Sequence, residues 1–121
     1  MTRILIVDDS PTQISAISKI LLKQGFDIIT AEDGAMGVEK ASSENPDIIL
    51  MDVVMPNLNG FQATRQITKN PETSHIPVIM LTSKDQETDK VWAERQGASD
   101  YLTKPPKEAD LLTKIKTALE N

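Results

Sequence analysis

The sequence predicts an α/β domain built on a doubly wound parallel sheet of five strands, with five helices. The first indication is a set of short apolar runs without alternation, such as Ile4–Val7 and Ile48–Met51, which are typical of strands buried on both faces. The second is that these runs alternate with segments whose apolar residues recur at helical spacing. Such alternation forms βαβ units, so the strands are expected to be parallel and to bind ligands beyond their carboxyl ends.

Each of the five strand–helix repeats has boundaries that can be justified in turn. Ser10 is a suitable N-cap for a first helix with Pro11 at its first position, and Gly25 is placed to end that helix. Asn45-Pro46 ends the second helix and Gly97 the fourth. The strands are expected at residues 4–7, 26–31, 47–51, 77–81 and 99–103, and the later helices at 34–44, 61–69, 87–96 and 107–119.

Three of the expected helices carry stripes of apolar residues that should face the sheet. In the first helix the stripe consists of Ile14, Ile17, Ile20 and Leu21. In the weaker second helix it consists of Ala35, Val38 and Ala41. The last helix has the clearest stripe, formed by Leu111, Leu112, Ile115, Ala118 and Leu119.

Composition indicates one acidic globular domain. The chain has 121 residues, of which 39% are hydrophobic and 26% charged, with a net charge of −5 that disfavours nucleic acid or an anionic membrane as a partner. No apolar run approaches the roughly 20 residues needed to cross a bilayer. The absence of cysteine suits the cytoplasm. We therefore expect a single cytoplasmic, monomeric domain over residues 1–121, with no output domain attached.

Three acidic residues lie at the ends of two buried strands. Asp8 and Asp9 follow the first apolar run, and Asp52 follows the third. Because the carboxyl ends of parallel strands meet at one edge of the sheet, these carboxylates should lie close together and need a positive partner. Mg²⁺ prefers oxygen ligands and commonly uses one or two carboxylates together with phosphate oxygens. The pattern therefore predicts a magnesium site.

Two further strand ends supply groups suited to phosphoryl transfer. Thr82 follows the fourth strand and offers a hydroxyl, and Lys104 follows the fifth and offers an ammonium group. An aspartate can act as a nucleophile toward phosphorus, and the transfer depends mainly on positioning and positive charge. Each residue alone also has an ordinary structural explanation as a helix cap, a turn residue or a solvated strand end. It is their joint placement that favours function.

These motifs together resemble a response-regulator receiver domain. The likeness covers the whole chain and is carried by Asp8-Asp9, residues 52–60, Thr82-Ser83 and residues 101–105. It implies a flavodoxin-like or CheY-like fold with strand order 2-1-3-4-5. It also implies a histidine kinase as phosphodonor and a downstream protein bound by the fourth helix, fifth strand and fifth helix.

The resemblance also implies a role for each site residue. Asp52 would be the phosphoacceptor, with Mg²⁺ held by Asp8, Asp9, Asp52 and the backbone carbonyl of Val54. Thr82 and Lys104 would bind the phosphoryl oxygens, and Tyr101 would be an aromatic switch that cooperates with Thr82. The Lys104–Pro105 peptide bond would be cis. Val54 and Lys84 would border the approach of water to the phosphorus. Taken without the resemblance, Tyr101 is simply a half-buried residue of an edge strand.

A closer likeness lies in residues 59–66 and 85–92, which resemble a small regulator of the chemotaxis-like system that controls twitching by type IV pili. Pro106 departs from the family, which often has an apolar or aromatic residue there. Trp92 is equally compatible with packing against the sheet and with a partner surface.

Two other classes of function stay open on the sequence. An aspartate-nucleophile phosphatase should have a second aspartate two residues after the nucleophile, and that position is Val54. A docking domain with a receiver fold that is never phosphorylated should lack one of the site residues, and all of them are present.

Overall fold

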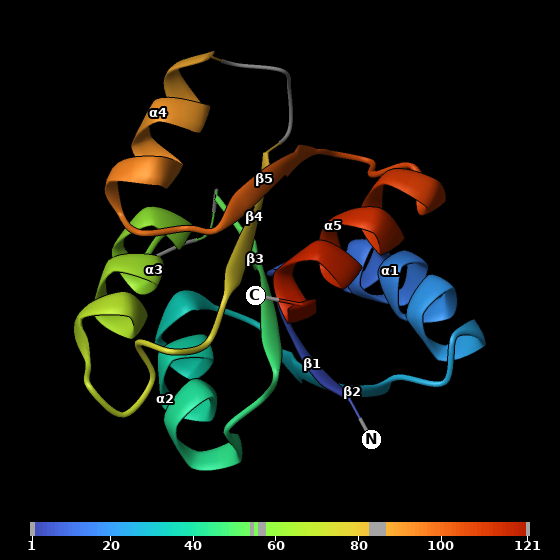
Figure 1. Cartoon of the computed structure of the whole chain (residues 1–121), viewed down its shortest axis with the longest axis horizontal. Coiled ribbons are helices and arrows are strands. Elements are labelled where there is room, and N and C mark those ends of the chain that lie inside the picture. Colours follow the sequence, from blue (N-terminus) through green and yellow to red (C-terminus); the bar gives the residue numbers. More distant parts are fainter. Residues whose placement is uncertain (1, 54, 56–57, 83–86, 121) are drawn as a thin grey trace.

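The five strands form one parallel sheet in the order β2-β1-β3-β4-β5, which Figure 1 shows between two layers of helices. The computed structural model describes residues 2–53, 55, 58–82 and 87–120, leaving aside the side chains of residues 87–90. The predicted fold class and strand order are confirmed. The strands are β1 (Arg3–Val7), β2 (Asp27–Ala31), β3 (Ile48–Asp52), β4 (Val78–Thr82) and β5 (Asp100–Thr103). The helices are α1 (Pro11–Lys23), α2 (Gly34–Glu44), α3 (Gly60–Lys69), α4 (Glu87–Arg95) and α5 (Glu108–Glu120).

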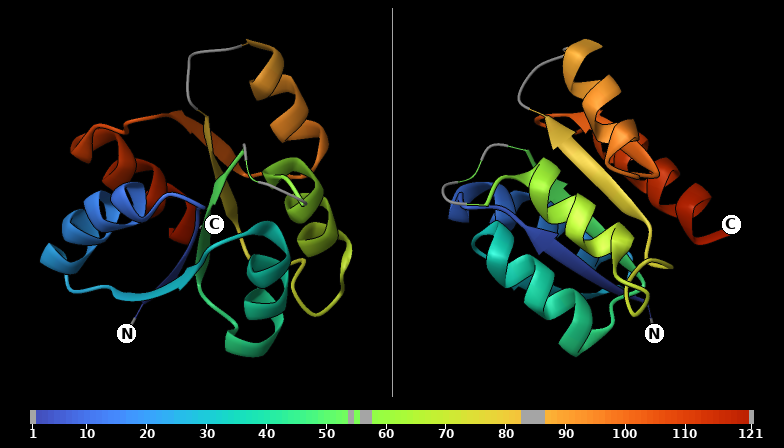
Figure 2. Two further views of the ribbon diagram at one scale, coloured as in Figure 1. Left: turned by 180° about the vertical axis from the view of Figure 1, so that it is seen from behind. Right: turned by 90° about the vertical axis from the view of Figure 1, so that its left-hand side faces the viewer.

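Helices cover both faces of the sheet. Figure 2 shows α1 and α5 on one face and α2, α3 and α4 on the other. The side chains of β1 alternate between the two faces, because Leu5 and Val7 pack into the cluster under α2 and α3, whereas Ile4 and Ile6 pack under α1 and α5. All four are fully buried. Burial on both faces is the physical reason why the strands appear in the sequence as unbroken apolar runs.

The helix ends follow the sequence closely. Ser10 caps α1 by accepting a hydrogen bond from the backbone N–H of Gln13 at 3.3 Å, and Gly25, with φ of 82°, follows its C-terminus. The C-cap of α2 is Asn45, in the left-handed region at φ of 47°. The helices α1 and α5 have 13 residues each. Within the described part of the chain, no helix has the length and apolar character needed to cross a membrane.

Two residues predicted to face inward are exposed. Ala35 is one of them, because the buried stripe of α2 runs through Gly34, Gly37 and Ala41 instead. An apolar pattern does not count glycine, so it misplaced the face of a helix that approaches the sheet through glycines. Leu119 is 37% exposed because it lies in the final turn of α5, where fewer neighbours cover the helix.

The strands β3 and β4 each begin and end one residue later than predicted, and this places the polar residues inside the ladder. Asp52 is the last residue of β3 and lies opposite Leu81 of β4. Thr82 is the last residue of β4 and lies opposite Thr103 of β5. Their backbones are therefore held by sheet hydrogen bonds, which fixes the starting points of both side chains.

The buried hydroxyl of Thr64 in α3 provides a test of the packing. Its Oγ1 has no hydrogen-bond partner among the described residues, although Thr64 is fully buried. Replacing it with the isosteric valine removes an unsatisfied polar group, so Thr64→Val should raise the free energy of unfolding by about 1 kcal/mol. The matched control is Thr73→Val. The buried Thr73 hydroxyl donates to the carbonyl of Ile67 at 2.6 Å, so this substitution should lower the free energy of unfolding by about 1 kcal/mol. Urea denaturation of both variants measures the difference, and a destabilised Thr64→Val would contradict it.

Candidate functional site

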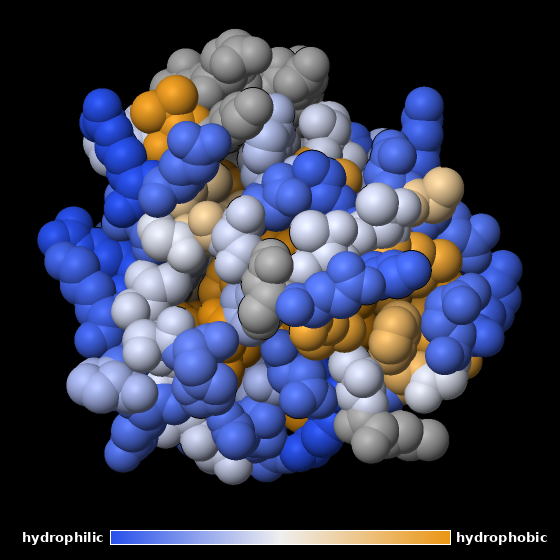
Figure 3. Space-filling view, in the orientation of Figure 1, coloured by the Kyte–Doolittle hydropathy of each residue, from blue (hydrophilic) through white to orange (hydrophobic). Residues whose placement is uncertain are grey.

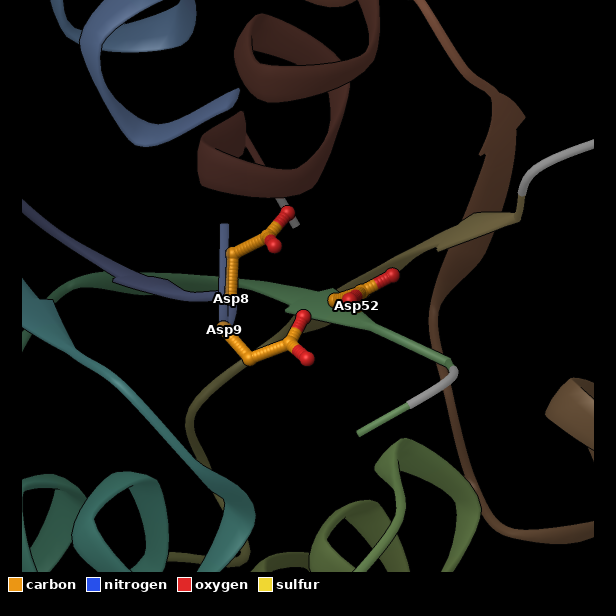
Figure 4. A group of neighbouring side chains, drawn as sticks. All are labelled: Asp8, Asp9 and Asp52. Atoms are coloured by element: carbon orange, nitrogen blue, oxygen red, sulfur yellow. The ribbon is translucent and has the colours of Figure 1, made fainter. Parts of the chain in front are cut away.

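Three carboxylates meet at the carboxyl ends of β1 and β3. One oxygen from each of Asp8, Asp9 and Asp52 lies within 4.8 Å of the others. Figure 4 shows Asp8 and Asp9 at the end of β1, with Asp9 reaching toward Asp52 on β3. Asp8 and Asp52 are 1% and 4% exposed, whereas Asp9 is exposed. β1 and β3 are neighbours in the sheet, with Val7 opposite Met51, so the topology itself produces this cluster.

Lys104 places its ammonium group between two of these carboxylates. Its Nζ lies 2.6 Å from Oδ1 of Asp52 and 3.0 Å from Oδ2 of Asp8. The lysine reaches this point because it follows β5 directly and its backbone N–H donates to the carbonyl of Thr82. The Lys104–Pro105 bond is cis, as the resemblance implied. The side chain of Lys104 is 13% exposed, so the two ion pairs are largely shielded from water.

Burial and the neighbouring carboxylates shift the protonation of the pair. Burial raises the pKa of Asp52 from 3.8 to about 6; the hydrogen bond from Lys104 opposes this rise, and the charges of Asp8 and Asp9 add to it. For Lys104, burial acts to lower the pKa, but the hydrogen bonds to Asp52 and Asp8 outweigh it and hold the pKa above its ordinary 10.5. At neutral pH the described cluster thus contains three carboxylates against one ammonium. Excess negative charge and oxygen donors suit a hard divalent cation such as Mg²⁺.

A supporting hydrogen bond was missed at the sequence level. The backbone N–H of Ser10 donates to Oδ1 of Asp8 at 2.9 Å, which holds this carboxylate while its other oxygen faces Lys104. Ser10 was expected to act only as a helix cap, and it does so as well. The two-residue spacing of Asp8 and Ser10 could have predicted this bond, because an aspartate commonly accepts a hydrogen bond from the backbone two residues later.

The other predicted residues that the structure describes lie on β4, β5 and α4. Thr82 is fully buried at the end of β4, the strand beside β3. Tyr101 is half-buried on the edge strand β5 and packs against the core. Trp92 is 45% exposed on α4, and the Arg95 guanidinium lies 5.4 Å from the centre of its ring. Val54 and Lys84 lie outside the described residues.

An acidic hollow adjoins the cluster. It has a volume of about 500 Å³ and extends from Asp8 and Asp9 over the start of α1 to Glu32 and Asp33, which follow β2. Pro11 and Ile14 add apolar surface to its wall. The cluster is therefore reached from a negatively charged side of the molecule, which favours the approach of cations.

Comparison with known proteins places this fold and site in a family. A family model for the response regulator receiver domain matches residues 4–116. The chain belongs to the response regulator receiver family, as its motifs predicted. This assignment supports a role in two-component signalling and favours a receiver over the phosphatase alternative. Receiver domains act as phosphoacceptor switches and bind Mg²⁺ at the acidic pocket.

Individual relatives support the same assignment. The chain is 60% identical over 119 residues to Protein PilH of Pseudomonas aeruginosa, and the match covers 98% of each sequence. It superposes on the chemotaxis protein CheY4 of Vibrio cholerae with a TM-score of 0.91 and 30% identity, covering 98% of this chain and 99% of that one. The receiver domain of a sensor histidine kinase from Pseudomonas aeruginosa, with a magnesium ion coordinated in its active site cleft, has a TM-score of 0.92, 32% identity and coverage of 99% and 98%.

The raised pKa of Asp52 predicts how stability depends on pH without metal. Between pH 3.8 and about 6 the folded state retains a proton on Asp52 that the unfolded state releases, so the contribution of Asp52 to wild-type stability falls as pH rises through this window. Asp52→Asn lacks this titration. Its stability relative to wild type should therefore increase from pH 4 to pH 7, by at most about 3 kcal/mol. Urea denaturation in EDTA across this range measures the difference, and one that stays constant or shrinks would contradict the assignment.

Proposed function

We propose that the protein is a phosphorylation-operated switch that accepts a phosphoryl group on Asp52 from a histidine kinase. The observation that carries the proposal is the buried carboxylate of Asp52, which is paired with Lys104 at 2.6 Å and clustered with Asp8 and Asp9. A nucleophilic carboxylate beside a fixed cation and two further acids has the parts that phosphoryl transfer needs. The family assignment and the similarity to PilH support it.

In the proposed reaction a carboxylate oxygen of Asp52 attacks the phosphorus of a phosphohistidine on the kinase. A P–O bond forms, the P–N bond breaks, and the imidazole leaves and takes up a proton from solvent. Lys104 would then exchange its contact with the Asp52 carboxylate for one with a phosphoryl oxygen, and the Thr82 hydroxyl would donate to another. Asp8, Asp9 and Asp52, with the carbonyl of Val54, would hold Mg²⁺, which neutralises charge as it develops on the phosphoryl oxygens. The protein would catalyse only its own phosphorylation and dephosphorylation.

The phosphorylated state would be read by another protein at the surface formed by α4, β5 and α5. A groove of about 710 Å³ lies between these elements and is lined by Tyr101, Pro106 and the Asp100–Lys114 ion pair, among others. On this side of the molecule, Figure 3 shows apolar residues between hydrophilic ones. Movement of Thr82 and Lys104 toward the phosphoryl group would change the packing of Tyr101 and so alter this groove. The exposed Trp92 would extend the partner surface along α4.

The similarity to PilH supports a biological setting as well. We propose that the protein acts as a monomeric, cytoplasmic receiver in a chemotaxis-like phosphorelay that controls twitching by type IV pili. Its output would be a protein–protein contact at the α4-β5-α5 surface. Retention of a binding partner by beryllofluoride-treated protein, but not by untreated protein, would identify that output.

Phosphorylation at Asp52 can be tested directly. With Mg²⁺ and acetyl phosphate, the protein should gain the mass of one phosphoryl group, because the donor replaces the kinase while Asp52 stays the nucleophile. Asp52→Asn should gain none, since an amide is a poor nucleophile. Asp27→Asn, which changes an exposed aspartate at the start of β2, is the matched control and should be labelled like the wild type. Equal labelling of all three proteins in intact-mass spectra would refute the assignment.

The acidic cluster should make stability respond to Mg²⁺. A Mg²⁺ concentration tenfold above the dissociation constant should raise the free energy of unfolding by about 1.4 kcal/mol through binding to the folded state alone. Asp9→Asn should reduce this gain, because one carboxylate ligand is lost. The control is Glu39→Gln, which removes an exposed carboxylate on α2 away from the cluster. Thermal denaturation with and without Mg²⁺ measures the effect, and an equal gain in all three proteins would place the ion elsewhere.

A further inference from the structure

The N-terminus of α3 packs directly on the backbone at the end of β3. A methyl group built on Gly60 would lie closer than 3.0 Å to the carbonyl oxygen of Asp52 and 2.8 Å from the Cα of Val53. The backbone N–H of Gly60 donates to the carbonyl of Val53 at 2.9 Å. Asn59 and Gln62 fix this end of the helix further through a capping box. The chain that leaves β3 therefore returns to its own strand end.

A second glycine makes a similar close contact with the backbone just before α3. Gly34 is the first residue of α2, and a methyl group built on it would lie closer than 3.0 Å to the carbonyl oxygen of Leu58. The same methyl would lie 3.2 Å from the Cβ of Leu58. The N-terminus of α2 is thus in close contact with the backbone just before α3, and the N-terminus of α3 is in close contact with the backbone of Asp52.

Space, and not backbone conformation, explains why glycine occupies these two positions. The described glycines with positive φ are Gly25 and Gly97, and neither Gly34 nor Gly60 is among them. Alanine could adopt either backbone conformation without strain. The nearest atoms to each added methyl are backbone atoms, which cannot move aside by a rotamer change. A methyl group must therefore displace the backbone of Asp52 or of the segment before α3.

We propose that Gly34 and Gly60 are positioning residues for the Asp52 carboxylate, acting through the stacked backbones of α2, Leu58, α3 and β3. This inference rests on the proposed function of Asp52. The 2.6 Å contact between Asp52 and Lys104 leaves little tolerance for a shift of the β3 end. Carboxylate positions within the cluster determine how well a metal is held, and loss of a supporting contact around a metal site typically costs 10–100-fold in affinity or activity.

The test compares Gly34→Ala and Gly60→Ala with Gly25→Ala as the matched control. Gly25 has φ of 82° and no atom within 4 Å of an added methyl, so its substitution strains the backbone without crowding the site. Mg²⁺ affinity is measured by isothermal titration calorimetry, phosphorylation rate by intact mass with acetyl phosphate, and folding by thermal denaturation. In folded protein, Gly34→Ala and Gly60→Ala should each weaken Mg²⁺ binding and slow labelling by about tenfold or more. Gly25→Ala should lower only the melting temperature.

Wild-type values in both assays, for either glycine variant in its folded form, would overturn the role of that glycine. A loss of equal size in Gly25→Ala would overturn the proposal as a whole, because the effect would then follow from reduced stability. If the wild type binds Mg²⁺ but takes no phosphoryl group, while Gly34→Ala binds Mg²⁺ weakly, the positioning role stands and the proposed function fails.

A measurement on the unmodified protein covers the case in which the variants do not fold. If the contact of α3 with β3 is coupled to the site, Mg²⁺ should slow hydrogen exchange of the Gly60 amide, which is bonded to Val53. The Gly97 amide, bonded to the carbonyl of Glu94 at 3.0 Å, is the internal reference and should change little. Equal effects of Mg²⁺ on both amides would contradict the inference.

Discussion

The ammonium group of Lys104, held between Asp8 and Asp52, is the interaction on which the site depends. Two carboxylates that are almost fully buried would repel each other and lack solvation without it. One lysine does not balance three carboxylates, however: burial raises the pKa of Asp52, and the charges of Asp8 and Asp9 add to that rise. The cluster in the folded chain therefore has an excess of negative charge. This excess makes the site suitable for a divalent cation and for a group whose transfer needs electrostatic stabilisation.

The parallel sheet produces this arrangement without special local geometry. β1, β3, β4 and β5 are adjacent, and all their carboxyl ends lie at one edge. Residues distant in the sequence, such as Asp8 and Lys104, come into contact because each follows directly from a strand end. The backbone hydrogen bond from Lys104 to Thr82 joins the last two of these ends. A small change in one strand end can therefore reach its neighbours through backbone contacts as well as through side chains.

Much of the fold and the site could be predicted because burial on both faces leaves a direct trace in the sequence. Unbroken apolar runs identified the strands, and the polar residues that end those runs indicated Asp8, Asp52, Thr82 and Lys104 as candidate site residues. One error occurred where the decisive contact has no apolar side chain. Ala35 was assigned to the buried face of α2 because Gly34 and Gly37 carry no hydrophobic signal. The double pairing of Lys104 could not be predicted either, since it depends on tertiary distances that no spacing in the chain encodes.

The two sides of the site differ in how firmly they are held. On the acidic side, Asp52 belongs to a strand ladder with α3 packed on its backbone, and Asp8 is fixed by the N–H of Ser10. On the cationic side, Lys104 reaches the site with a long side chain from the residue after β5. In the proposed mechanism, the acids stay in place while the lysine changes partners. Because Tyr101 lies on β5 three residues before Lys104, a shift of this lysine acts on the strand that borders the groove. The acidic side would thus keep the reacting carboxylates in place, and the cationic side would transmit the change at Lys104 to the groove.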